Sequence, residues 1–232
     1  MTPTSADLWH HYGRARAQRD RVVPETFHWT WDQDQHGGPG TEILGDLSGR
    51  IVADLGAGAA RQAAHLAVHH EPVRVDAVDA SPAQQAMATD LSGHLGPRVR
   101  IVPSDAVLHL RANASTYDVL CSAFGAVDFT DPRELLPAAA TALRPGGRLV
   151  FSTLAHYLGG TPAEPDIVPA DIPAKTPDGE ATTMRRWVLQ KHVWTKVLDE
   201  SGFTRISTDP LPSTAQGPRT ADTLLVSAFH PA

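Results

Sequence analysis

The chain has 232 residues, of which 41% are hydrophobic and 20% charged, and its formal net charge is −6. This length and composition predict one globular domain with a sizeable core, and the acidic balance disfavours nucleic acid and anionic membrane surfaces as partners. Cys121 is the only cysteine, which excludes an intramolecular disulfide, and no apolar run approaches the roughly 20 residues of a membrane span. The N-terminus lacks the apolar core of a signal peptide, so we expect a cytoplasmic protein.

The first fifty residues predict a helix over residues 5–19, followed by a cap (FHWTWDQDQHGGPG) over the mouth of a sheet. Short apolar or β-branched segments then alternate with helical ones. The expected strands are residues 51–55, 73–78, 99–102, 117–121 and 148–152, and the expected helices are residues 61–70, 82–94, 106–112 and 132–143. Such alternation indicates an α/β fold, a parallel sheet with helices on both faces.

Two helix starts are marked by a capping residue before proline, Ser81 before Pro82 and Asp131 before Pro132. Residues 155–180 are dense in Pro, Gly, Asp and Glu, which favours a long surface excursion. The remaining segments predict a short strand (MRRWVLQ), a helix ended by Gly202 (QKHVWTKVLDESG), a strand (FTRISTDP) and a last strand that closes the sheet (TADTLLVSAFH).

The stretch IVADLGAGAARQAAHLA predicts a strand, a glycine turn and a helix. In an open α/β sheet such a turn lies at the carboxyl ends of the strands, where ligands bind, and Gly56 and Gly58 let the backbone approach one closely. A dinucleotide fingerprint needs a third small residue at the position of Arg61, which disfavours NAD.

Three acids lie at or near the carboxyl ends of successive strands. Asp54 lies beside the turn and favours a cationic group, Asp79 can accept both hydroxyls of a ribose, and Asp105 can accept from an adenine amine. Asp79 and Asp105 together describe an adenosine site.

Five segments occur in this order: DLGAGAAR, VDASP, PSDA, YDVLCSAFGAVDF and LRPGGRLVFST. In this order they resemble the class I S-adenosylmethionine-dependent methyltransferases. More narrowly, they resemble the small actinobacterial members associated with specialised metabolism, including antibiotic biosynthesis. The resemblance covers about residues 45–155. It implies a doubly wound, Rossmann-like, mostly parallel seven-stranded sheet whose last two strands form an antiparallel pair, here with an N-terminal helical cap. We divide the single domain into a cap (1–48), a cofactor-binding core (49–153), a substrate-side loop or lid (154–189) and a C-terminal helix with the strand pair (190–232).

The resemblance also implies S-adenosylmethionine as cofactor and S-adenosylhomocysteine as product. The positions that match cofactor-binding residues of the family are Asp54, Gly56, Gly58, Arg61, Asp79, Ala80, Asp105, Ala106 and Ser122, with Ala123 beside the last. The chain departs from the family at Ala60, where glycine is usual. Alanine is small and favours the helix that begins there, so we interpret it as a tolerated variant.

Methyl transfer needs alignment, a dry site and at most one general base, and requires no metal. The catalytic candidates are His156, Asp128 and Tyr157, with His10 and His11 as further possibilities. His156 is favoured as base because it begins the long loop and titrates near neutrality, although a loop histidine facing water is an equal interpretation. Asp128 can orient a substrate amine, or can simply cap the approach to the next helix.

The acceptor side is assigned to aromatic residues, because they give large contact areas at low entropic cost, although core packing is the more common role of any single one. The candidates are Tyr12, Trp29, Trp31 and Phe124, with Trp9 as a further aromatic. His65 and His69 have a spacing that can chelate zinc, but no third ligand is indicated, which favours a solvated histidine face. Cys121 lies in an apolar strand and is interpreted as a structural thiol.

The leading hypothesis is methyl transfer to N, O or C of a small metabolite. A second hypothesis keeps the fold without methylation: the helix N-terminus and Arg61 hold an anionic leaving group during an intramolecular ring closure. A third is a non-catalytic member that binds a partner chain. The sequence does not determine the oligomeric state.

Overall fold

The computed structural model describes residues 8–9, 22–31, 38–176, 178–215, 217 and 220–232. Within these residues the main sheet has seven strands in the order β3-β2-β1-β4-β5-β9-β8. Its strands are β1 (Ile51–Leu55), β2 (Arg74–Asp79), β3 (Val99–Pro103), β4 (Tyr117–Ala123), β5 (Leu143–Leu154), β8 (Thr204–Leu211) and β9 (Thr223–Phe229). The helices are η1 (Thr41–Leu44), α2 (Arg61–His69), α3 (Pro82–Ser92), η2 (Gly93–Leu95), α4 (Ala106–Arg111), α5 (Ala126–Phe129), α6 (Pro132–Ala142) and α7 (Lys191–Glu200).

The doubly wound sheet predicted from the alternation is confirmed. Strands β1 to β5 pair in parallel, whereas β9 pairs antiparallel with both β5 and β8. The last strand therefore lies inside the sheet, and β8 is the edge. The physical reason is burial: most side chains of β9 are buried, whereas those of β8 are exposed or half-buried, so the more apolar strand takes the interior place.

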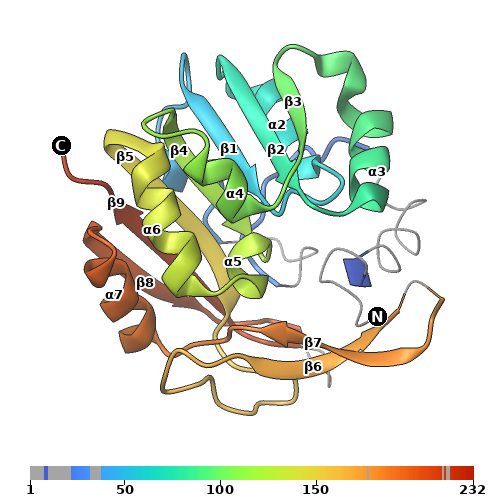
Figure 1. Cartoon of the computed structure of the whole chain (residues 1–232), viewed down its shortest axis with the longest axis vertical. Coiled ribbons are helices and arrows are strands. Elements are labelled where there is room, and N and C mark those ends of the chain that lie inside the picture. Colours follow the sequence, from blue (N-terminus) through green and yellow to red (C-terminus); the bar gives the residue numbers. More distant parts are fainter. Residues whose placement is uncertain (1–7, 10–21, 32–37, 177, 216, 218–219) are drawn as a thin grey trace.

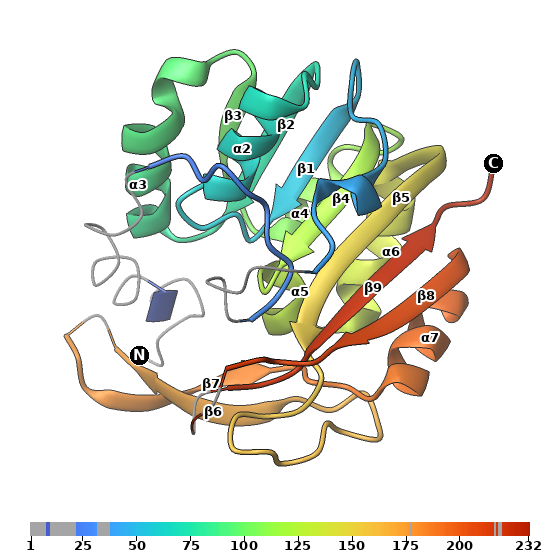
Figure 2. The same cartoon turned by 180° about the vertical axis from the view of Figure 1, so that it is seen from behind.

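Helices cover both faces of the sheet (Figure 1). Helices α4, α6 and α7 pack over one apolar cluster, which contains large side chains such as Phe151 and Trp194. On the other face, α2 and α3 pack with η1 and with a segment that carries Phe27 and Trp29 (Figure 2). The helices that follow β1, β2 and β3 begin at the carboxyl edge of the sheet, which is where ligands bind in such folds.

The helix ends follow the predicted caps in part. Asp131 caps α6 by accepting from the Arg133 amide, and Gly202, in the left-handed region with φ of 86°, follows α7. Ser81 occupies the N-cap position of α3, but its hydroxyl makes no capping bond, and its amide donates to the Asp79 carboxylate at 2.8 Å.

The excursion predicted for residues 155–180 is partly regular, which corrects that prediction. Strands β6 (Ala170–Lys175) and β7 (Ala181–Arg186) form an antiparallel hairpin. The hairpin lies beyond the carboxyl ends of the parallel strands (Figure 1). The sequence does not show the alternation of apolar and polar residues that indicates a strand, because only Ala174, Met184 and Arg186 of the two strands are buried. Of the predicted N-terminal helix, only Leu8 and Trp9 are described, and they pack with the hairpin.

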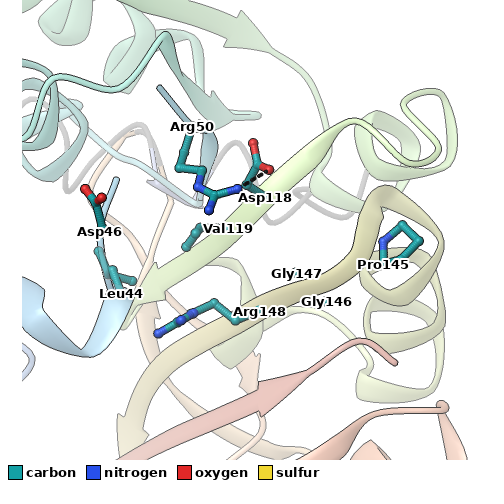
Figure 3. Close-up of a pocket in the computed structure, with 9 residues that line it drawn as sticks. All are labelled: Leu44, Asp46, Arg50, Asp118, Val119, Pro145, Gly146, Gly147 and Arg148. Carbon is teal, nitrogen blue, oxygen red and sulfur yellow. Dashed lines mark hydrogen bonds and ion pairs between the residues drawn. The ribbon is translucent and has the colours of Figure 1, made fainter. Parts of the chain in front are cut away.

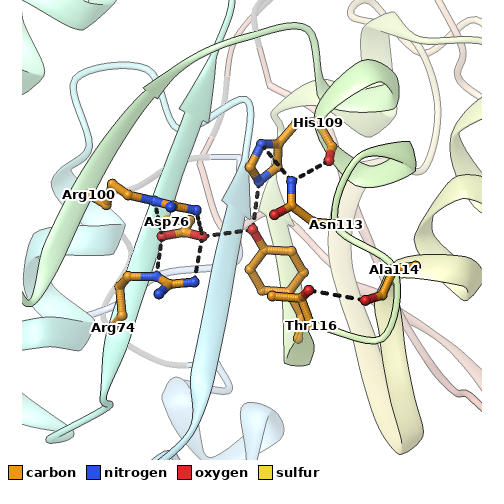
Figure 4. Close-up of polar contacts among 8 residues, drawn as sticks. Arg74, Asp76, Arg100, His109, Asn113, Ala114 and Thr116 are labelled. Atoms are coloured by element: carbon orange, nitrogen blue, oxygen red, sulfur yellow. Dashed lines mark hydrogen bonds and ion pairs between the residues drawn. The ribbon is translucent and has the colours of Figure 1, made fainter.

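A buried carboxylate ties β2 to β3 and β4 (Figure 4). Asp76 is fully buried and accepts from Arg74 at 2.7 Å, from Arg100 at 2.6 Å and from the Tyr117 hydroxyl at 2.7 Å. His109 on α4 meets the same hydroxyl at 2.6 Å. Because each polar group has a partner, the network positions β2, whose end carries Asp79, without an orphaned charge. None of the helices in the described part of the chain is long and apolar enough to cross a membrane.

Candidate functional site

The glycine turn after β1 is held tightly against its neighbours. The amides of Gly56 and Ala57 both donate to the Val78 carbonyl, at 2.9 and 3.0 Å, so the turn is bonded to β2. Gly56 has φ of 73°, and a Cβ there would lie 2.2 Å from the Ala126 amide nitrogen. Only glycine fits such a position, which brings the backbone of the turn against the start of α5.

Ala60 adopts the conformation of a glycine. It is the N-cap of α2, with φ of 57° and ψ of 29°, and it is fully buried. The expectation that alanine is tolerated there because it favours the helix is wrong, since the residue precedes the helix in the left-handed region. An L-residue pays about 1–2 kcal/mol for that conformation. The backbone course of the turn is nevertheless retained.

Asp79, at the end of β2, faces the turn. Its carboxylate accepts from the Gly58 amide at 2.9 Å and from the Ser81 amide at 2.8 Å. Burial raises its pKa, and these two amides lower it. Each oxygen keeps a further lone pair, so the carboxylate is fixed in place while it can still accept from a ligand hydroxyl.

Asp54 lies beneath the same turn and is nearly fully buried. Its Oδ2 has no hydrogen-bond partner among the residues that the structure describes. Burial, followed by the Asp79 charge, raises the pKa of Asp54 to about 7, and the Ala63 amide partly offsets this. An unsatisfied buried carboxylate beside a glycine turn suits a cationic ligand group.

Asp54→Asn is expected to make the protein more stable at pH 8. Because the folded state raises the pKa of Asp54 from 3.8 to about 7, it binds this proton more tightly than the unfolded state does. The contribution of Asp54 to stability is therefore full below about pH 4 and is lost as the pH rises through about 7. The neutral amide avoids that loss, whose upper limit is about 4 kcal/mol. Urea unfolding at pH 5 and 8 measures it. The exposed Asp90→Asn is the control, and parallel profiles for Asp54→Asn and wild type would contradict the prediction.

The remaining predicted cofactor positions lie around the same edge. Asp105 is the N-cap of α4 and uses Oδ1 to accept from Val107 and Leu108, while the side chain as a whole is exposed. Ala80 is exposed, Ala106 is buried, and Arg61 is the half-buried first residue of α2. Ser122 is buried, and its hydroxyl donates to the Leu55 carbonyl at 2.8 Å, so it joins the ends of β4 and β1.

Three predicted acceptor-side or catalytic residues lie in one cluster. Trp31, Phe124 and Tyr157 pack around Leu154 and Val188, and the rings of Trp31 and Phe124 meet edge to face at 5.2 Å. Phe124 follows β4 in the left-handed region with φ of 50°. The Tyr157 hydroxyl donates to Glu164 at 3.3 Å, and burial raises the pKa of Tyr157 to about 12.

Trp29 does not belong to that cluster. It is fully buried on the α2 face, and its indole donates to the Gly40 carbonyl at 2.9 Å. The structure therefore assigns it to the core, because its polar atom and its whole ring are already engaged. Tyr12, His10 and His11 lie outside the described residues.

Asp128 is a buried ion-pair partner. It is fully buried on α5 and accepts two hydrogen bonds from Arg186 on β7, one of them from Nε at 3.0 Å. The Arg186 guanidinium lies over the rings of Trp31 and Phe129 at 5.2 and 5.3 Å. Burial raises the pKa of Asp128, and Arg186 opposes that. The helix-capping interpretation of Asp128 is wrong, since the carboxylate instead holds the hairpin to the sheet edge.

Arg186 was missed by the sequence reasoning. Its signal is weak: it shares a face of its strand with Met184, so the alternation of ATTMRR places a guanidinium at a buried position. Only the approach of Asp128, 58 residues earlier, explains why a charge is tolerated there.

His156 has both ring nitrogens engaged. Nδ1 donates to the Tyr157 carbonyl at 2.9 Å, and Nε2 accepts from the Asp222 amide at 3.2 Å. Because a carbonyl can only accept and an amide N–H can only donate, these two contacts fix the orientation of the ring. His156 therefore ties the end of β5 to the start of β9, and both of its ring nitrogens are engaged within the protein.

Two cavities in the described part of the chain lie elsewhere. One, of about 100 Å³, is at the amino edge of β4 and β5, where Arg50 pairs with Asp118 (Figure 3). The other, of about 480 Å³, faces α2 and η1. His65 points toward the second cavity but is buried, which corrects the solvated face expected for it. Cys121 is buried in β4, and burial raises the pKa of its thiol well above the ordinary value.

Residues 52–147 match the family model described as a methyltransferase domain. A search of curated proteins gives no match. Among solved structures, the chain is similar to a putative S-adenosylmethionine-dependent methyltransferase from Listeria monocytogenes, with 16% identity and a TM-score of 0.60 over 83% of this chain and 96% of that one.

It is also similar to the 1,6-didemethyltoxoflavin-N1-methyltransferase of Burkholderia thailandensis, solved with 1,6-didemethyltoxoflavin and S-adenosylhomocysteine bound. The identity is 19% and the TM-score 0.63, over 100% of this chain and 93% of that one. A methyltransferase from Mesorhizobium loti gives 21% identity and a TM-score of 0.58, over 81% and 94% of the two chains. At these identities the structures establish the fold alone.

The strand order, the antiparallel β9 and the glycine turn define the class I methyltransferase fold. The core of the chain, residues 52–147, is similar to the methyltransferase domain that this family model describes.

Proposed function

We propose that this protein transfers a methyl group from S-adenosylmethionine to a small-molecule acceptor, in specialised metabolism. The observation that carries the proposal is the pair of acids at the glycine turn, the buried Asp54 with an unsatisfied oxygen and the half-buried Asp79 held by two amides. These two carboxylates are hydrogen-bond acceptors, and they suit a ligand that combines a cationic amine with the hydroxyls of a ribose. The net charge of −6 supports a small acceptor over a nucleic acid.

Three carboxylates would hold the cofactor. Asp79 would accept from the ribose hydroxyls, Asp54 would stabilise the ammonium of the methionine portion, and Oδ2 of Asp105 would accept from the adenine amine. Asp105 uses only Oδ1 to cap its helix, which leaves Oδ2 available for this role. When bound, the cofactor supplies an electrophilic methyl group on a sulfonium.

The acceptor would lie at the carboxyl ends of β4 and β5, near Trp31 and Phe124. Since both nitrogens of His156 are engaged, we assign it a positioning role in place of the general base. Asp128 is paired with Arg186, and the Tyr157 hydroxyl is engaged by Glu164. These residues would orient the acceptor and exclude water, and their polar atoms are already engaged by protein groups. We therefore propose an acceptor whose nucleophilic atom needs no strong base, such as a ring nitrogen. The neighbour solved with 1,6-didemethyltoxoflavin, an N1-methyltransferase by its name, is an example of such an acceptor class.

The ring-closure hypothesis receives less support. It needs an anion at the start of α2, but Asp54 and Asp79 lie at the same turn and place negative charge there. Their repulsion opposes an anionic leaving group at distances of a few ångströms. The partner-binding hypothesis predicts cofactor affinity without turnover, and an acceptor screen separates it from catalysis.

Asp79→Ala is expected to lower the affinity for S-adenosylhomocysteine by about 10- to 100-fold, because hydrogen bonds to a charged group contribute roughly 1.5–3 kcal/mol. Isothermal titration of protein freed of copurified cofactor measures the change. Asp90→Ala, on the exposed side of α3, is the matched control and should bind like wild type. Unchanged affinity in Asp79→Ala would contradict the ribose assignment, and no binding by wild type would overturn the proposed function.

A further inference from the structure

The larger cavity lies away from the glycine turn. It has a volume of about 480 Å³ and is lined by polar groups from three segments, residues 25–28, residues 38–42 and the end of α2. Four of its lining residues are histidines, namely His28, His65, His69 and His70. Since α2 rises about 1.5 Å per residue, His65 and His69 lie about 6 and 12 Å along the helix from Arg61. None of the described residues that line the cavity belongs to the proposed cofactor site.

The charge of the cavity favours a cation. Glu25 and Glu42 contribute two carboxylates, and no lysine or arginine is among the described residues that line it. His69 also lies in the last turn of α2, where the helix dipole stabilises positive charge.

The backbone contact of His65 fixes its tautomer. Its Nδ1 lies 2.8 Å from the Pro24 carbonyl, and because a carbonyl only accepts, Nδ1 carries the proton. Nε2 is then the bare nitrogen. A backbone carbonyl that fixes the tautomer in this way is the usual second partner of a metal-ligating histidine.

The spacing of the rings fits a shared ion. With a metal–nitrogen bond of about 2.1 Å, a ring centre lies about 3.2 Å from the metal, so two ligating imidazoles at 90–110° have centres about 4.5–5.2 Å apart. The centres of His65 and His69 are 4.7 Å apart, and those of His65 and His70 are 5.5 Å apart. The i, i+4 pair therefore has the separation of a chelate.

We infer that His65 and His69 form a binding site for a divalent transition-metal ion of the imidazole-preferring class, such as Ni²⁺ or Zn²⁺. No group of three potential ligands is assembled among the described residues as they stand. Water would fill the remaining coordination positions.

Metal binding at this site would strengthen the docking of the segment before η1. The His65 ring contacts Phe27 at 6.0 Å and holds the Pro24 carbonyl, and the same segment continues to Trp31 in the proposed acceptor cluster. An ion that immobilises His65 thus links metal occupancy to the order of this segment.

The test is isothermal titration of Ni²⁺ into the full chain, prepared without a histidine tag and treated with chelator. We expect one site of micromolar affinity, and a rise in Tm of roughly 5 °C or more at a hundredfold excess over Kd. His69→Ala, an exposed position, should weaken binding at least tenfold and remove the rise in Tm. His94→Ala, exposed on η2, is the matched control and should leave both unchanged.

Two readouts keep the result unambiguous. Circular dichroism and S-adenosylhomocysteine affinity should be the same in His69→Ala as in wild type, because the turn is remote, so a loss of metal binding is not a loss of fold. Wild-type affinity in His69→Ala, an equal loss in His94→Ala, or no binding below millimolar metal would overturn the proposal.

Discussion

Gly56→Ala is expected to lower the free energy of unfolding by about 2–4 kcal/mol and to abolish measurable S-adenosylhomocysteine binding. Two penalties combine. The residue has φ of 73°, and its new methyl group would lie 2.2 Å from the Ala126 amide nitrogen. Since the atoms nearest the new methyl group all belong to the backbone of Gly125 and Ala126, the turn or α5 must move. Either shift displaces the bonds of Gly56 and Ala57 to Val78 that hold the turn on β2. Urea unfolding and isothermal titration measure the two effects.

Gly146→Ala is the control for this variant. Gly146 has nearly the same φ, 74°, but a Cβ there would meet no atom within 4 Å. It should therefore suffer only the backbone strain, about 1 kcal/mol, with cofactor affinity unchanged. The difference between the two variants reports the close approach of the turn to α5. Equal losses of stability would mean that the turn tolerates a side chain, and unchanged S-adenosylhomocysteine affinity in Gly56→Ala would contradict the cofactor assignment of Gly56.

Asp128→Ala is expected to destabilise the protein by about 3–5 kcal/mol, because it leaves the buried Arg186 guanidinium without its counter-charge. Arg186 is only 5% exposed and lies against two aromatic rings, so water cannot replace the carboxylate without moving the hairpin. Chemical unfolding measures the loss. Increased protease cleavage within residues 170–186 would show that the loss of stability is local to the hairpin of β6 and β7.

A double variant separates charge from packing. Asp128→Leu with Arg186→Met removes both charges and should recover most of the stability lost in Asp128→Ala. Glu134→Ala, in the exposed pair with Arg111 at 3.8 Å, should cost less than about 0.5 kcal/mol. If Asp128→Ala behaved like Glu134→Ala, the Asp128–Arg186 pair would not be what holds the hairpin.

The local sequence predicts more of the site than of its surroundings. Asp54, Gly56 and Asp79 lie at one edge of the sheet, as their positions in the sequence predict, because the carboxyl ends of neighbouring parallel strands meet there. Their roles toward a cofactor belong to the proposed function. Ala60 shows where local prediction fails. The high helix propensity of alanine suggests a helical residue, whereas the position before α2 requires a left-handed backbone conformation.

What the sequence by itself determined is the alternation of strands and helices, the class of the fold and the order of the acids along it. These are local or periodic properties, because the apolar pattern that buries one face of an element lies within that element. Only the tertiary structure decided that Arg186 meets Asp128, that both nitrogens of His156 are engaged, that Trp29 is core and that His65 is buried beside three other histidines. Each of these depends on partners distant in the chain. The free energy of a polar or aromatic side chain is set by those partners, and no spacing within a segment encodes them.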